Sequence, residues 1–453
     1  MSTIAAIATP NASGGIGVIR ISGEEAITVA DRVFCSVSGK KLCDIKGYTA
    51  LFGHICENGS VIDECVALVF RAPRSYTGED VVELSCHGGQ FVTQKVLRIV
   101  LSNGASPAEA GEFTKRAFLN GKIDLAQAES VMNIISAHGQ QALNAAANTL
   151  DGKLSEKISA VAAKLTNIAA GIAVWTDDPD EDVPQAHEDN VRAVVEASVS
   201  ELEILIKNFD SGRAVTQGVS TAICGHPNVG KSTLMNQLTG CDRSIVTEIA
   251  GTTRDVIEET VRLGDIVLHL ADTAGIHESD DIVEAIGIDR TMKKLETAEL
   301  ILAVFDYSQQ LTDDDIKLLE KCAGRRAVAV INKTDLESKI DITKIKEYIP
   351  HTVQLSAAKG EGLEELKNVI SSLLGTAELD TSSGVLANER QYNCCTSALD
   401  SLKEALDGLM MGVTLDAVNV SIDYATEKLL ELTGEKARDA VVNEVFSKFC
   451  VGK

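Results

Sequence analysis

The pattern of apolar and polar positions is most regular in the middle of the chain, between residues 215 and 376. Four apolar runs there predict buried strands, at residues 219–224, 266–271, 327–331 and 353–355. Each run ends at a polar or glycine-containing segment, and helical spacing follows the first run at residues 232–238. Alternating strands and helices favour a doubly wound, mostly parallel sheet, which binds ligands at the carboxyl ends of its strands.

The flanking parts of the chain have different patterns. Residues 1–120 combine glycine-rich turns with strand-like runs at 16–21, 65–70 and 80–84, which predicts a separate α/β domain. Helical spacing dominates residues 121–214 and returns in 377–453. Its clearest stretches are residues 126–135, 191–209 and 441–449, and an acidic segment with a proline, 177–182, predicts a solvated loop. The two helical stretches are expected to pack as one discontinuous domain around the inserted central part.

Composition narrows the function classes. The 453 residues include 66 acidic and 42 basic side chains, a formal charge of −24, which argues against a broad face for RNA or DNA. A local basic patch, or RNA held mainly by a partner, stays open. The 11 cysteines show no metal-ligand spacing, so reduced cytosolic thiols are expected. We expect neither a signal peptide nor a membrane span, because no apolar run approaches about 18 residues.

A glycine-rich loop follows the first predicted strand. It reads Gly225-His226-Pro227-Asn228-Val229-Gly230-Lys231-Ser232, which matches the G-x-x-x-x-G-K-S pattern of phosphate-binding loops. Its backbone N–H groups can surround phosphate oxygens, Lys231 can reach the β- and γ-phosphates, and the Ser232 hydroxyl can bind Mg²⁺. The strand–loop–helix context is the one this motif requires.

Three further motifs follow later strands. Asp272-Thr273-Ala274-Gly275 offers an acid that can hold Mg²⁺ through water and a glycine N–H near the γ-phosphate. In Asn332-Lys333-Thr334-Asp335, the Asp335 carboxylate can accept both N–H donors of guanine, a donor pair that adenine lacks. Ser356-Ala357-Ala358 completes the base pocket. The order of the motifs predicts a Ras-like P-loop G domain that binds and hydrolyses GTP.

Catalysis needs groups that this pattern does not supply directly. Ile276 follows the glycine of the second motif and cannot orient water, so Glu284 is a candidate for that role; alternatively, Glu284 is one of several exposed acids. Asn228 either coordinates a monovalent cation beside the phosphates or is an ordinary turn asparagine. Thr253 is the better threonine candidate for Mg²⁺, and backbone oxygens of residues 247–250 can wrap a cation.

Other short segments have open interpretations. The terminal Gly452-Lys453 is either a frayed tail or, with an apolar helix before it, a docked end. Residues 73–80 and 111–122 are candidate turns, and Cys86-His87 is more typical of a structural pair than of a catalytic one.

These segments together resemble the MnmE (TrmE) tRNA-modification GTPases. The matching stretches are residues 3–22, 75–89, 111–128, the G motifs with 251–255, and the terminal Cys450-Val451-Gly452-Lys453, so the resemblance spans essentially the whole chain. It implies a folate-binding and dimerisation domain over 1–120, a helical domain from 121–214 and 377–453, and a G domain over 215–376. It also implies a cytoplasmic homodimer that forms a heterotetramer with an FAD-dependent partner, MnmG.

The activity that the resemblance implies is tRNA modification. Family members and MnmG install a carboxymethylaminomethyl or aminomethyl-type group at C5 of the wobble uridine, U34, of certain tRNAs. A 5-formyl- or 5,10-methylene-tetrahydrofolate supplies the one-carbon unit, FAD belongs to the partner, and the partner is expected to hold most of the tRNA. A ribosome-assembly GTPase switch is the alternative, but such a chain has no reason to end in C-x-G-K.

Residue by residue, the resemblance assigns roles. It places K⁺ ligands on Asn228, Thr247, Ile249 and Thr252, Mg²⁺ ligands on Ser232 and Thr253, the catalytic glutamate on Glu284, folate contacts on Arg20, Glu83, Lys122 and Lys453, and a cysteine of unsettled role on Cys450. The residues expected to contact GTP are Asn228, Val229, Gly230, Lys231, Ser232, Thr233, Thr247, Glu248, Ile249, Ala250, Gly251, Thr252, Thr253, Asp272, Thr273, Ala274, Gly275, Asn332, Lys333, Asp335, Ser356, Ala357 and Ala358. The chain departs from the family at Asn11-Ala12-Ser13, usually Pro-Gly-Arg, and at His277, often arginine.

Overall fold

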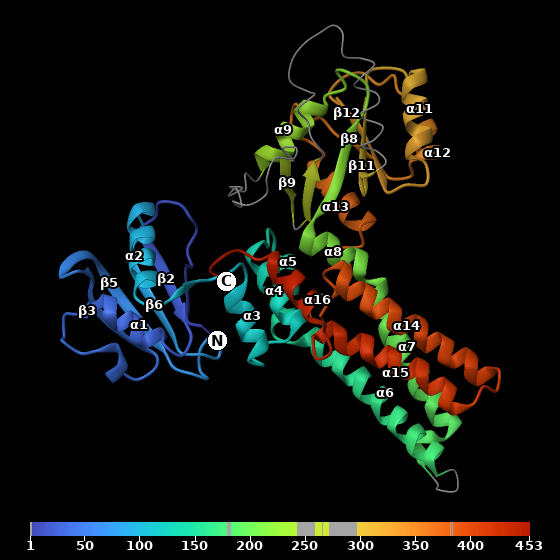
Figure 1. The fold of residues 1–453 in the computed structure, drawn as a ribbon. Coiled ribbons are helices and arrows are strands. Elements are labelled where there is room, and N and C mark those ends of the chain that lie inside the picture. Colours follow the sequence, from blue (N-terminus) through green and yellow to red (C-terminus); the bar gives the residue numbers. More distant parts are fainter. Residues whose placement is uncertain are drawn as a thin grey trace. The chain divides into compact units, whose positions relative to one another are not determined.

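A computed structural model describes most of the chain. The described residues are 2–178, 183–241, 259–264, 266–270, 297–380, 382 and 384–453. They form two compact units. Figure 1 shows the ribbon coloured along the sequence, with the helices and strands labelled. The first comprises Met1–Met132, Ser155–Asn167 and Ile422–Lys453, and the second comprises Asn133–Leu154 and Ile168–Ser421. The division of the chain at residues 120, 214 and 376 stays a prediction.

The first unit is built on a seven-stranded sheet with the order β3-β4-β5-β6-β2-β1-β7. Its strands are β1 (Ile4–Ile7), β2 (Ile16–Ser22), β3 (Phe34–Ser36), β4 (Thr49–Glu57), β5 (Ser60–Phe70), β6 (Val81–His87) and β7 (Ser106–Pro107). Helices α1 (Ala26–Val33) and α2 (Gln90–Ser102) pack on one face through a core that includes Ile19, Val69 and Leu84. The three predicted strand runs are confirmed. Because side chains alternate along a strand, Arg20 and Glu83 point to the opposite face.

Helices of the first unit pack beside that sheet. They are α3 (Glu112–Leu119), α4 (Leu125–Ile135) and α16 (Asp439–Ser447), and their shared core includes Leu125, Phe446 and Phe449. The interpretation of residues 111–122 as a turn was wrong, since α3 occupies most of the segment. Glu112 and Arg116, four residues apart, form an ion pair of 2.7 Å that stabilises α3, a helix too short for a clear apolar period.

The second unit contains a six-stranded sheet with the order β13-β12-β11-β8-β10-β9. Its strands are β8 (Val219–Cys224), β9 (Glu259–Leu263), β10 (Ile266–Leu270), β11 (Leu300–Asp306), β12 (Ala327–Asn332) and β13 (Thr352–Gln354). All neighbouring pairs are parallel except β10 with β9. The four predicted buried strands are confirmed as β8, β10, β12 and β13.

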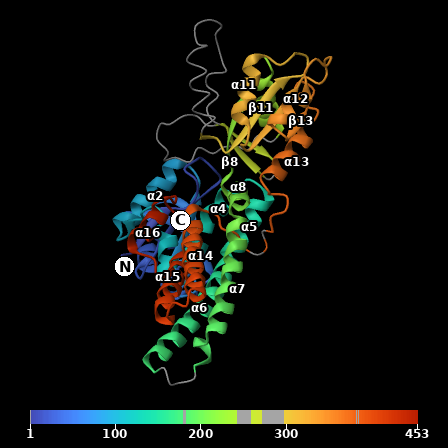
Figure 2. The same ribbon diagram turned by 90° about the vertical axis from the view of Figure 1, so that its right-hand side faces the viewer.

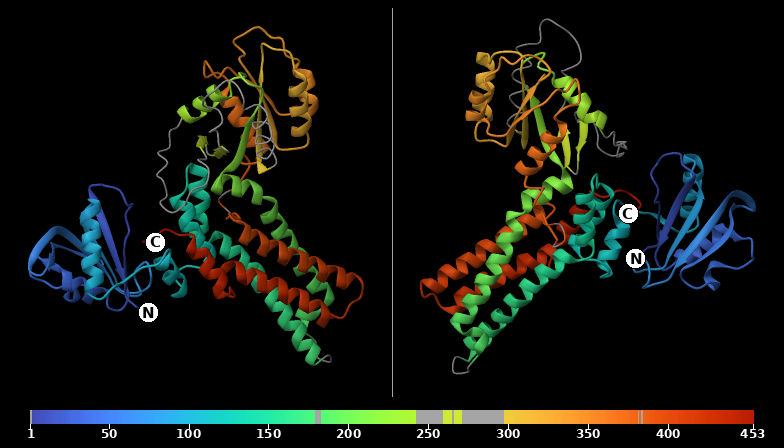
Figure 3. Two further views of the ribbon diagram at one scale, coloured as in Figure 1. Left: turned by 45° about the horizontal axis from the view of Figure 1, so that its top comes forward. Right: turned by 180° about the vertical axis from the view of Figure 1, so that it is seen from behind.

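Helices cover both faces of this parallel sheet (Figure 3). One face packs against α9 (Lys231–Cys241) and α13 (Leu363–Leu373), and the other against α11 (Asp313–Cys322) and α12 (Ile342–Tyr348). This is the doubly wound arrangement that the sequence pattern predicts, and it brings the carboxyl ends of β8, β11 and β12 to one edge.

Further helices complete the second unit. They include α5 (Gln140–Leu150), α7 (Glu188–Lys207), α8 (Phe209–Gln217) and α14 (Glu389–Met410), while α6 (Lys153–Asp177) and α15 (Leu415–Thr433) contribute to both units. Helices α7 and α14 lie side by side (Figure 2). The predicted helical stretch 191–209 is interrupted at Asn208, between α7 and α8. Most of the predicted acidic loop, residues 179–182, lies outside the described residues.

The sequence analysis expected no segment long and apolar enough to span a membrane, but helix α6 meets that criterion. Among the described helices, it alone is long and apolar enough by length and composition to cross a membrane. A core helix of a soluble protein passes the same test, and Leu154, Ile158 and Leu165 of α6 are fully buried.

Candidate functional site

The loop after β8 has the backbone conformation of a phosphate-binding loop. Gly225 and Gly230 have φ values of +147° and +96°, where L side chains are strained. A Cβ on Gly225 would lie 2.2 Å from the Val304 carbonyl oxygen, and one on Gly230 would lie 2.2 Å from Asn332 Nδ2. Asn228 is left-handed as well, with φ +64°, a conformation that asparagine adopts more readily than most residues. Both glycines are therefore required by the loop itself.

Lys231 begins helix α9 and reaches back across the loop. Its Nζ donates to the carbonyl oxygens of Gly225 and His226, each at 2.9 Å. Burial lowers the pKa of Lys231. Ser232 and Thr233 follow in the first helical turn, where N–H groups lack intrahelical partners and favour an anion. The loop and helix end together present a cation, open N–H donors and two hydroxyls.

Asn332 ties three motifs together. Its side chain is 2% exposed. Nδ2 donates to the Val229 carbonyl oxygen and Oδ1 accepts from the Ala357 N–H, both at 2.9 Å. One amide thereby holds the phosphate-binding loop and the loop after β13 to the end of β12. These contacts bring Asn332, Val229 and Ala357 together, and their role in GTP binding stays a prediction.

Lys333 adds a second connection, through a residue that the sequence analysis missed. Its Nζ donates to the Asn228 carbonyl oxygen at 2.7 Å and to Asp306 Oδ2 at 2.6 Å. Burial raises the pKa of Asp306, but hydrogen bonds from Lys333 and Ser308 outweigh it, so the pKa lies below its usual range. Asp306 is the polar residue at the end of the apolar strand β11. The rule that selected Asn332 at the end of β12 could have found it.

Asp335 presents an exposed carboxylate beside this network. Its Oδ1 accepts a hydrogen bond of 2.7 Å from the buried Ser356 hydroxyl, which lowers the pKa of Asp335. The carboxylate is therefore charged at neutral pH, with one oxygen fixed and the other available to donors. Ser356 and Ala357 are buried and Ala358 is exposed. This arrangement suits recognition of two adjacent N–H donors.

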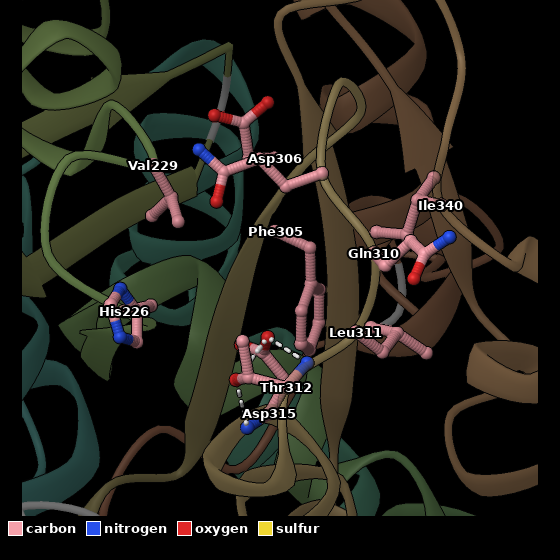
Figure 4. Close-up of a pocket in the computed structure, with 10 residues that line it drawn as sticks. His226, Val229, Phe305, Asp306, Gln310, Leu311, Thr312, Asp315 and Ile340 are labelled. Atoms are coloured by element: carbon pink, nitrogen blue, oxygen red, sulfur yellow. Dashed lines mark hydrogen bonds between the residues drawn. The ribbon is translucent and has the colours of Figure 1, made fainter.

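A small cavity lies behind the phosphate-binding loop (Figure 4). Its volume is about 20 Å³, room for a single water molecule. His226 and Val229 of the loop face Phe305 of β11, and Thr312 and Asp315 cap the start of α11 by reciprocal hydrogen bonds of 2.9 and 3.2 Å. The cavity is too small for a nucleotide, so it is not the nucleotide-binding site.

The remaining nucleotide-site predictions lie outside the described residues. They are Thr247, Glu248, Ile249, Ala250, Gly251, Thr252, Thr253, Asp272, Thr273, Ala274, Gly275, Ile276, His277 and Glu284. Within the described ranges, no group of three or more His, Cys, Asp or Glu side chains is placed to hold a metal ion. The Mg²⁺ and K⁺ ligand assignments stay predictions.

A second polar site lies on the outer face of the first unit's sheet. Arg20 on β2 faces Glu83 on β6, and its Nε and Nη2 both donate to Glu83 Oε1 at 2.9 Å. The Arg20 guanidinium also lies 5.4 Å from the ring centre of Tyr76 and 5.6 Å from that of Phe113. The sequence predictions placed Arg20 and Glu83 together, but they did not include the two rings.

The end of the chain is docked at this site. The Gly111 N–H donates to the Cys450 carbonyl oxygen at 3.3 Å, and the Phe113 N–H donates to that of Lys453 at 3.2 Å. Gly452 has φ +100°, and a Cβ there would lie 2.4 Å from the Ile7 carbonyl oxygen. Of the two alternatives for the terminus, the structure has the docked one.

The terminus also meets the charged pair. Arg20 Nη1 lies 3.5 Å from the Gly452 carbonyl oxygen. Burial and the charge of Arg20 lower the pKa of the Lys453 side chain, and Glu83 opposes this shift. Arg20, Glu83 and Lys453 are therefore neighbours. Lys122 lies to one side, where its Nζ donates to the Pro73 carbonyl oxygen at 3.3 Å.

A buried ion-pair group supports the loop before β6, and the sequence analysis missed it. Arg116 of α3, 3% exposed, pairs with Glu79 at 3.1 Å and with Glu112 at 2.7 Å. Glu79 also accepts from the Ser22 hydroxyl at 2.7 Å. The group holds residues 73–80 against α3, and thereby fixes Tyr76 beside Arg20. Only the tertiary contact distinguishes Arg116 from other arginines in the sequence.

The structure also shows the surroundings of Cys86, His87 and Cys450, and of the loop at Asn11-Ala12-Ser13. Burial raises the pKa of Cys86 to about 11, and its thiol donates to the Gly17 carbonyl oxygen at 3.5 Å, so it is a structural residue. His87 is exposed and pairs with Asp63 at 2.7 Å. Cys450 is exposed and free. In the loop where the chain departs from the family pattern, the Asn11 carbonyl oxygen accepts from Gln90 at 2.9 Å.

The sheet order, the glycine loop and the exposed Asp335 define the class of this protein: a P-loop GTPase with an N-terminal α/β domain and a helical domain. Two family models match it, "GTP-binding protein TrmE N-terminus" over residues 3–122 and "MnmE helical domain" over residues 125–450. The chain belongs to the MnmE (TrmE) family of tRNA modification GTPases and is a GTP hydrolase. GTPases of this class use Mg²⁺.

Three relatives show how far the similarity extends. The tRNA modification GTPase MnmE of Lactococcus lactis subsp. cremoris is 43% identical over 453 residues, covering 100% of this chain and 98% of that protein. The MnmE of Bacillus pumilus is 41% identical over 461 residues and covers 100% of both chains. The MnmE of Clostridioides difficile is 40% identical over 454 residues, covering 100% of this chain and 99% of that one.

Proposed function

We propose that this chain is the GTP-hydrolysing component of a system that modifies C5 of the wobble uridine, U34, of certain tRNAs. It acts with an FAD-dependent protein of the MnmG type in a cytoplasmic heterotetramer, and the product carries a carboxymethylaminomethyl or aminomethyl-type group. The partner holds the FAD and most of the tRNA. A formal charge of −24 supports this division, because it leaves this chain little surface that would attract an RNA backbone.

One observation carries the proposal more than any other. The terminal Lys453 lies beside Arg20 and Glu83 in a chain that also carries the Asn332–Asp335 guanine site. If this chain were a GTPase switch without modification chemistry, residues 450–453 would have no function that requires docking at a charged site built from Arg20 and Glu83.

The direct test is mass spectrometry of tRNA nucleosides from a strain that lacks this gene. We expect C5-modified wobble uridines to disappear and to return when the wild-type gene is supplied. An unchanged wobble uridine profile, together with altered ribosomal subunits, would reject the proposal in favour of a ribosome-assembly GTPase.

We assign the Arg20–Glu83 site to a tetrahydrofolate derivative that donates the one-carbon unit. The Glu83 carboxylate can accept from N–H donors of the pterin ring, while Arg20, Lys122 and Lys453 can meet carbonyl or carboxylate oxygens. Tyr76, which is 37% exposed, lies against Arg20 and offers apolar surface to a flat ring, whereas Phe113 is fully buried and packs beneath the Arg20 guanidinium.

Glu83→Ala should weaken binding of 5-formyltetrahydrofolate by about 10- to 100-fold, the cost of losing one or two hydrogen bonds to a charged group. Calorimetric titration measures it. Glu64→Ala, an exposed acid on neighbouring β5, is the matched control and should bind as wild type does. Equal affinity in the Glu83→Ala protein would count against this site. Trimming residues 450–453 tests the role of Lys453 separately.

We also propose that the chain forms a homodimer through the outer face of the first unit's sheet. Phe52 of β4 and Val66 of β5 lie opposite each other there, 52% and 41% exposed. Exposed neighbouring apolar side chains of this kind favour a protein interface. Sedimentation should show a dimer that Phe52→Lys weakens, whereas Phe91→Lys, on the exposed surface of α2, leaves it intact.

In the G domain, we assign phosphate binding to Lys231 and the loop N–H groups, and Mg²⁺ to Ser232 and Thr253. Asn228 and residues 247–252 hold K⁺ next to the phosphates, and Glu284 orients the attacking water. The support is the left-handed Asn228 and the position of Lys231, together with the family pattern at the other positions.

A further inference from the structure

A groove with two arginines lies at one end of the first unit's sheet. Its lining residues are Gly47, Tyr48, Arg71, Ala72, Pro73 and Arg74, from the segments just before β4 and just after β5, and its volume is about 280 Å³. This volume is slightly below that of pockets for whole small molecules, about 300–1,000 Å³. It suits part of an extended ligand better than a complete cofactor.

The charge of the groove is basic. The Arg71 guanidinium is held by the carbonyl oxygens of Cys43 and Ile45 at 2.8 and 3.1 Å, which fixes its direction. Arg74 is exposed, Lys46 precedes the lining residue Gly47, and Lys122 donates to the Pro73 carbonyl oxygen.

Three acidic side chains lie in the same segments, and one of them, Glu79, is already paired with Arg116. Asp80 accepts from the Ala72 N–H at 2.8 Å, and Asp44 is exposed two residues before Lys46. Since Glu79 is paired with Arg116, the four cations face two remaining acids, Asp44 and Asp80, which makes the groove positive in a chain whose formal charge is −24. An anionic ligand is therefore the chemistry that it fits.

The groove lies a short distance along β5 from the Arg20–Glu83 site. Leu68 of β5 is the register partner of Glu83, and Phe70 lies two residues further on, about 6–7 Å along the strand. Arg71 follows at once, and the Tyr48 and Phe70 rings meet edge to face at 5.5 Å. On the other side, the segment from Pro73 to Tyr76 leads from the groove to the ring that contacts Arg20.

We propose that this groove binds the γ-linked glutamate tail of a polyglutamylated tetrahydrofolate. The proposal rests on the assignment of the Arg20–Glu83 site to the folate rings. A ligand whose rings lie at Glu83 extends past Lys122 toward Pro73, and further glutamates then reach Arg74, Arg71 and Lys46. Repeated carboxylates match the spaced cations, the Tyr48 ring offers apolar surface to the tail methylenes, and the small volume fits an unbranched chain.

Calorimetry with the full-length protein tests the proposal, using 5-formyltetrahydrofolate as the monoglutamate and the pentaglutamate. We expect the pentaglutamate to bind about 5- to 10-fold tighter at low salt, since each exposed ion pair contributes modestly, and the gain to shrink as salt is added. Arg74→Gln combined with Lys46→Gln should remove most of the gain and leave monoglutamate binding unchanged. Arg98→Gln, an exposed arginine on α2 over the opposite face of the sheet, is the control and should retain the gain.

The outcomes separate this inference from the folate assignment. Equal affinities for the two folates, or a gain that survives in the Arg74→Gln, Lys46→Gln protein, would overturn the groove as the tail site and leave the folate site standing. If neither folate binds, the folate assignment fails and the groove proposal fails with it. If the double variant weakens tRNA binding instead, with no difference between the folates, the groove is a contact for RNA phosphates and the proposal is wrong.

Discussion

Replacing Asp335 by asparagine should lower GTP affinity by about 10²–10³, because hydrogen bonds to a charged acceptor contribute about 1.5–3 kcal/mol each. The exposed Asp335 carboxylate has one oxygen fixed by Ser356 and a pKa below its usual range, so it is a charged acceptor at neutral pH. The amide of the substituted side chain would present a donor where guanine also presents donors. Preference should therefore shift toward xanthosine nucleotides, which have a carbonyl at that position.

Titration with fluorescent GTP and xanthosine triphosphate analogues measures this change. Asp314→Asn is the matched control, because Asp314 is an exposed acid of the same sheet unit that pairs with Lys317 at 2.9 Å. It should bind GTP as the wild type does. Unchanged GTP affinity in the Asp335→Asn protein would reject the assignment of Asp335 to the guanine base.

The central sheet could be predicted because its strands are buried on both faces. Strands β8 and β12 lie between two layers of helices, so most of their residues are apolar and the runs stand out from the amphipathic segments around them. Strand β11 has the same apolar pattern, but the sequence analysis did not identify it. The same topology places the loop residues after β8 and β12 at one edge. That is why Asn332 and the glycine loop, separated by about a hundred residues, could be assigned to one site before the contact between Asn332 and Val229 was seen.

The contacts that support the sites could not be predicted in the same way. Arg116 is buried because Glu79 and Glu112 approach it from two elements, and no local pattern specifies that meeting. The docked terminus depends on backbone hydrogen bonds from Gly111 and Phe113, which have no side-chain signature. Asp306 is an exception, since its position at the end of an apolar strand was visible in the sequence.

The second large effect concerns hydrolysis. Glu284→Ala should spare GTP binding but lower turnover by about 10²–10³, the usual cost of removing one group that stabilises or positions the reacting atoms. Ile276 cannot orient the attacking water, so the carboxylate of Glu284 carries that role in this proposal. Glu278 is a glutamate six residues earlier in the same acidic segment and has no assigned role. Glu278→Ala is therefore the matched control and should retain wild-type turnover.

The same proposal requires potassium and pairing of two G domains. The charge that develops on the phosphates in the transition state needs a cation beyond Lys231 and Mg²⁺, and the phosphate-binding loop contains no arginine. Asn228 is already held in the left-handed conformation by the loop, and its carbonyl oxygen is fixed by Lys333 at 2.7 Å, which leaves the side-chain amide to meet an ion. Oxygens of residues 247–252 can complete the coordination when a second G domain presses on them. An ion the size of potassium should therefore activate, and sodium should not.

Steady-state hydrolysis in potassium and in sodium, at several protein concentrations, decides between this mechanism and an ordinary switch. Turnover per molecule should rise with concentration in potassium, because pairing completes the ion site, and should stay low in sodium at every concentration. Asn228→Ala should lose the potassium effect while Lys231 continues to hold the nucleotide. Three results together would contradict this mechanism: equal rates in both salts, no dependence on protein concentration, and a fully active Glu284→Ala protein. They would indicate a GTPase that needs an external activator. In that case neither Asn228 nor Glu284 would have the role assigned here.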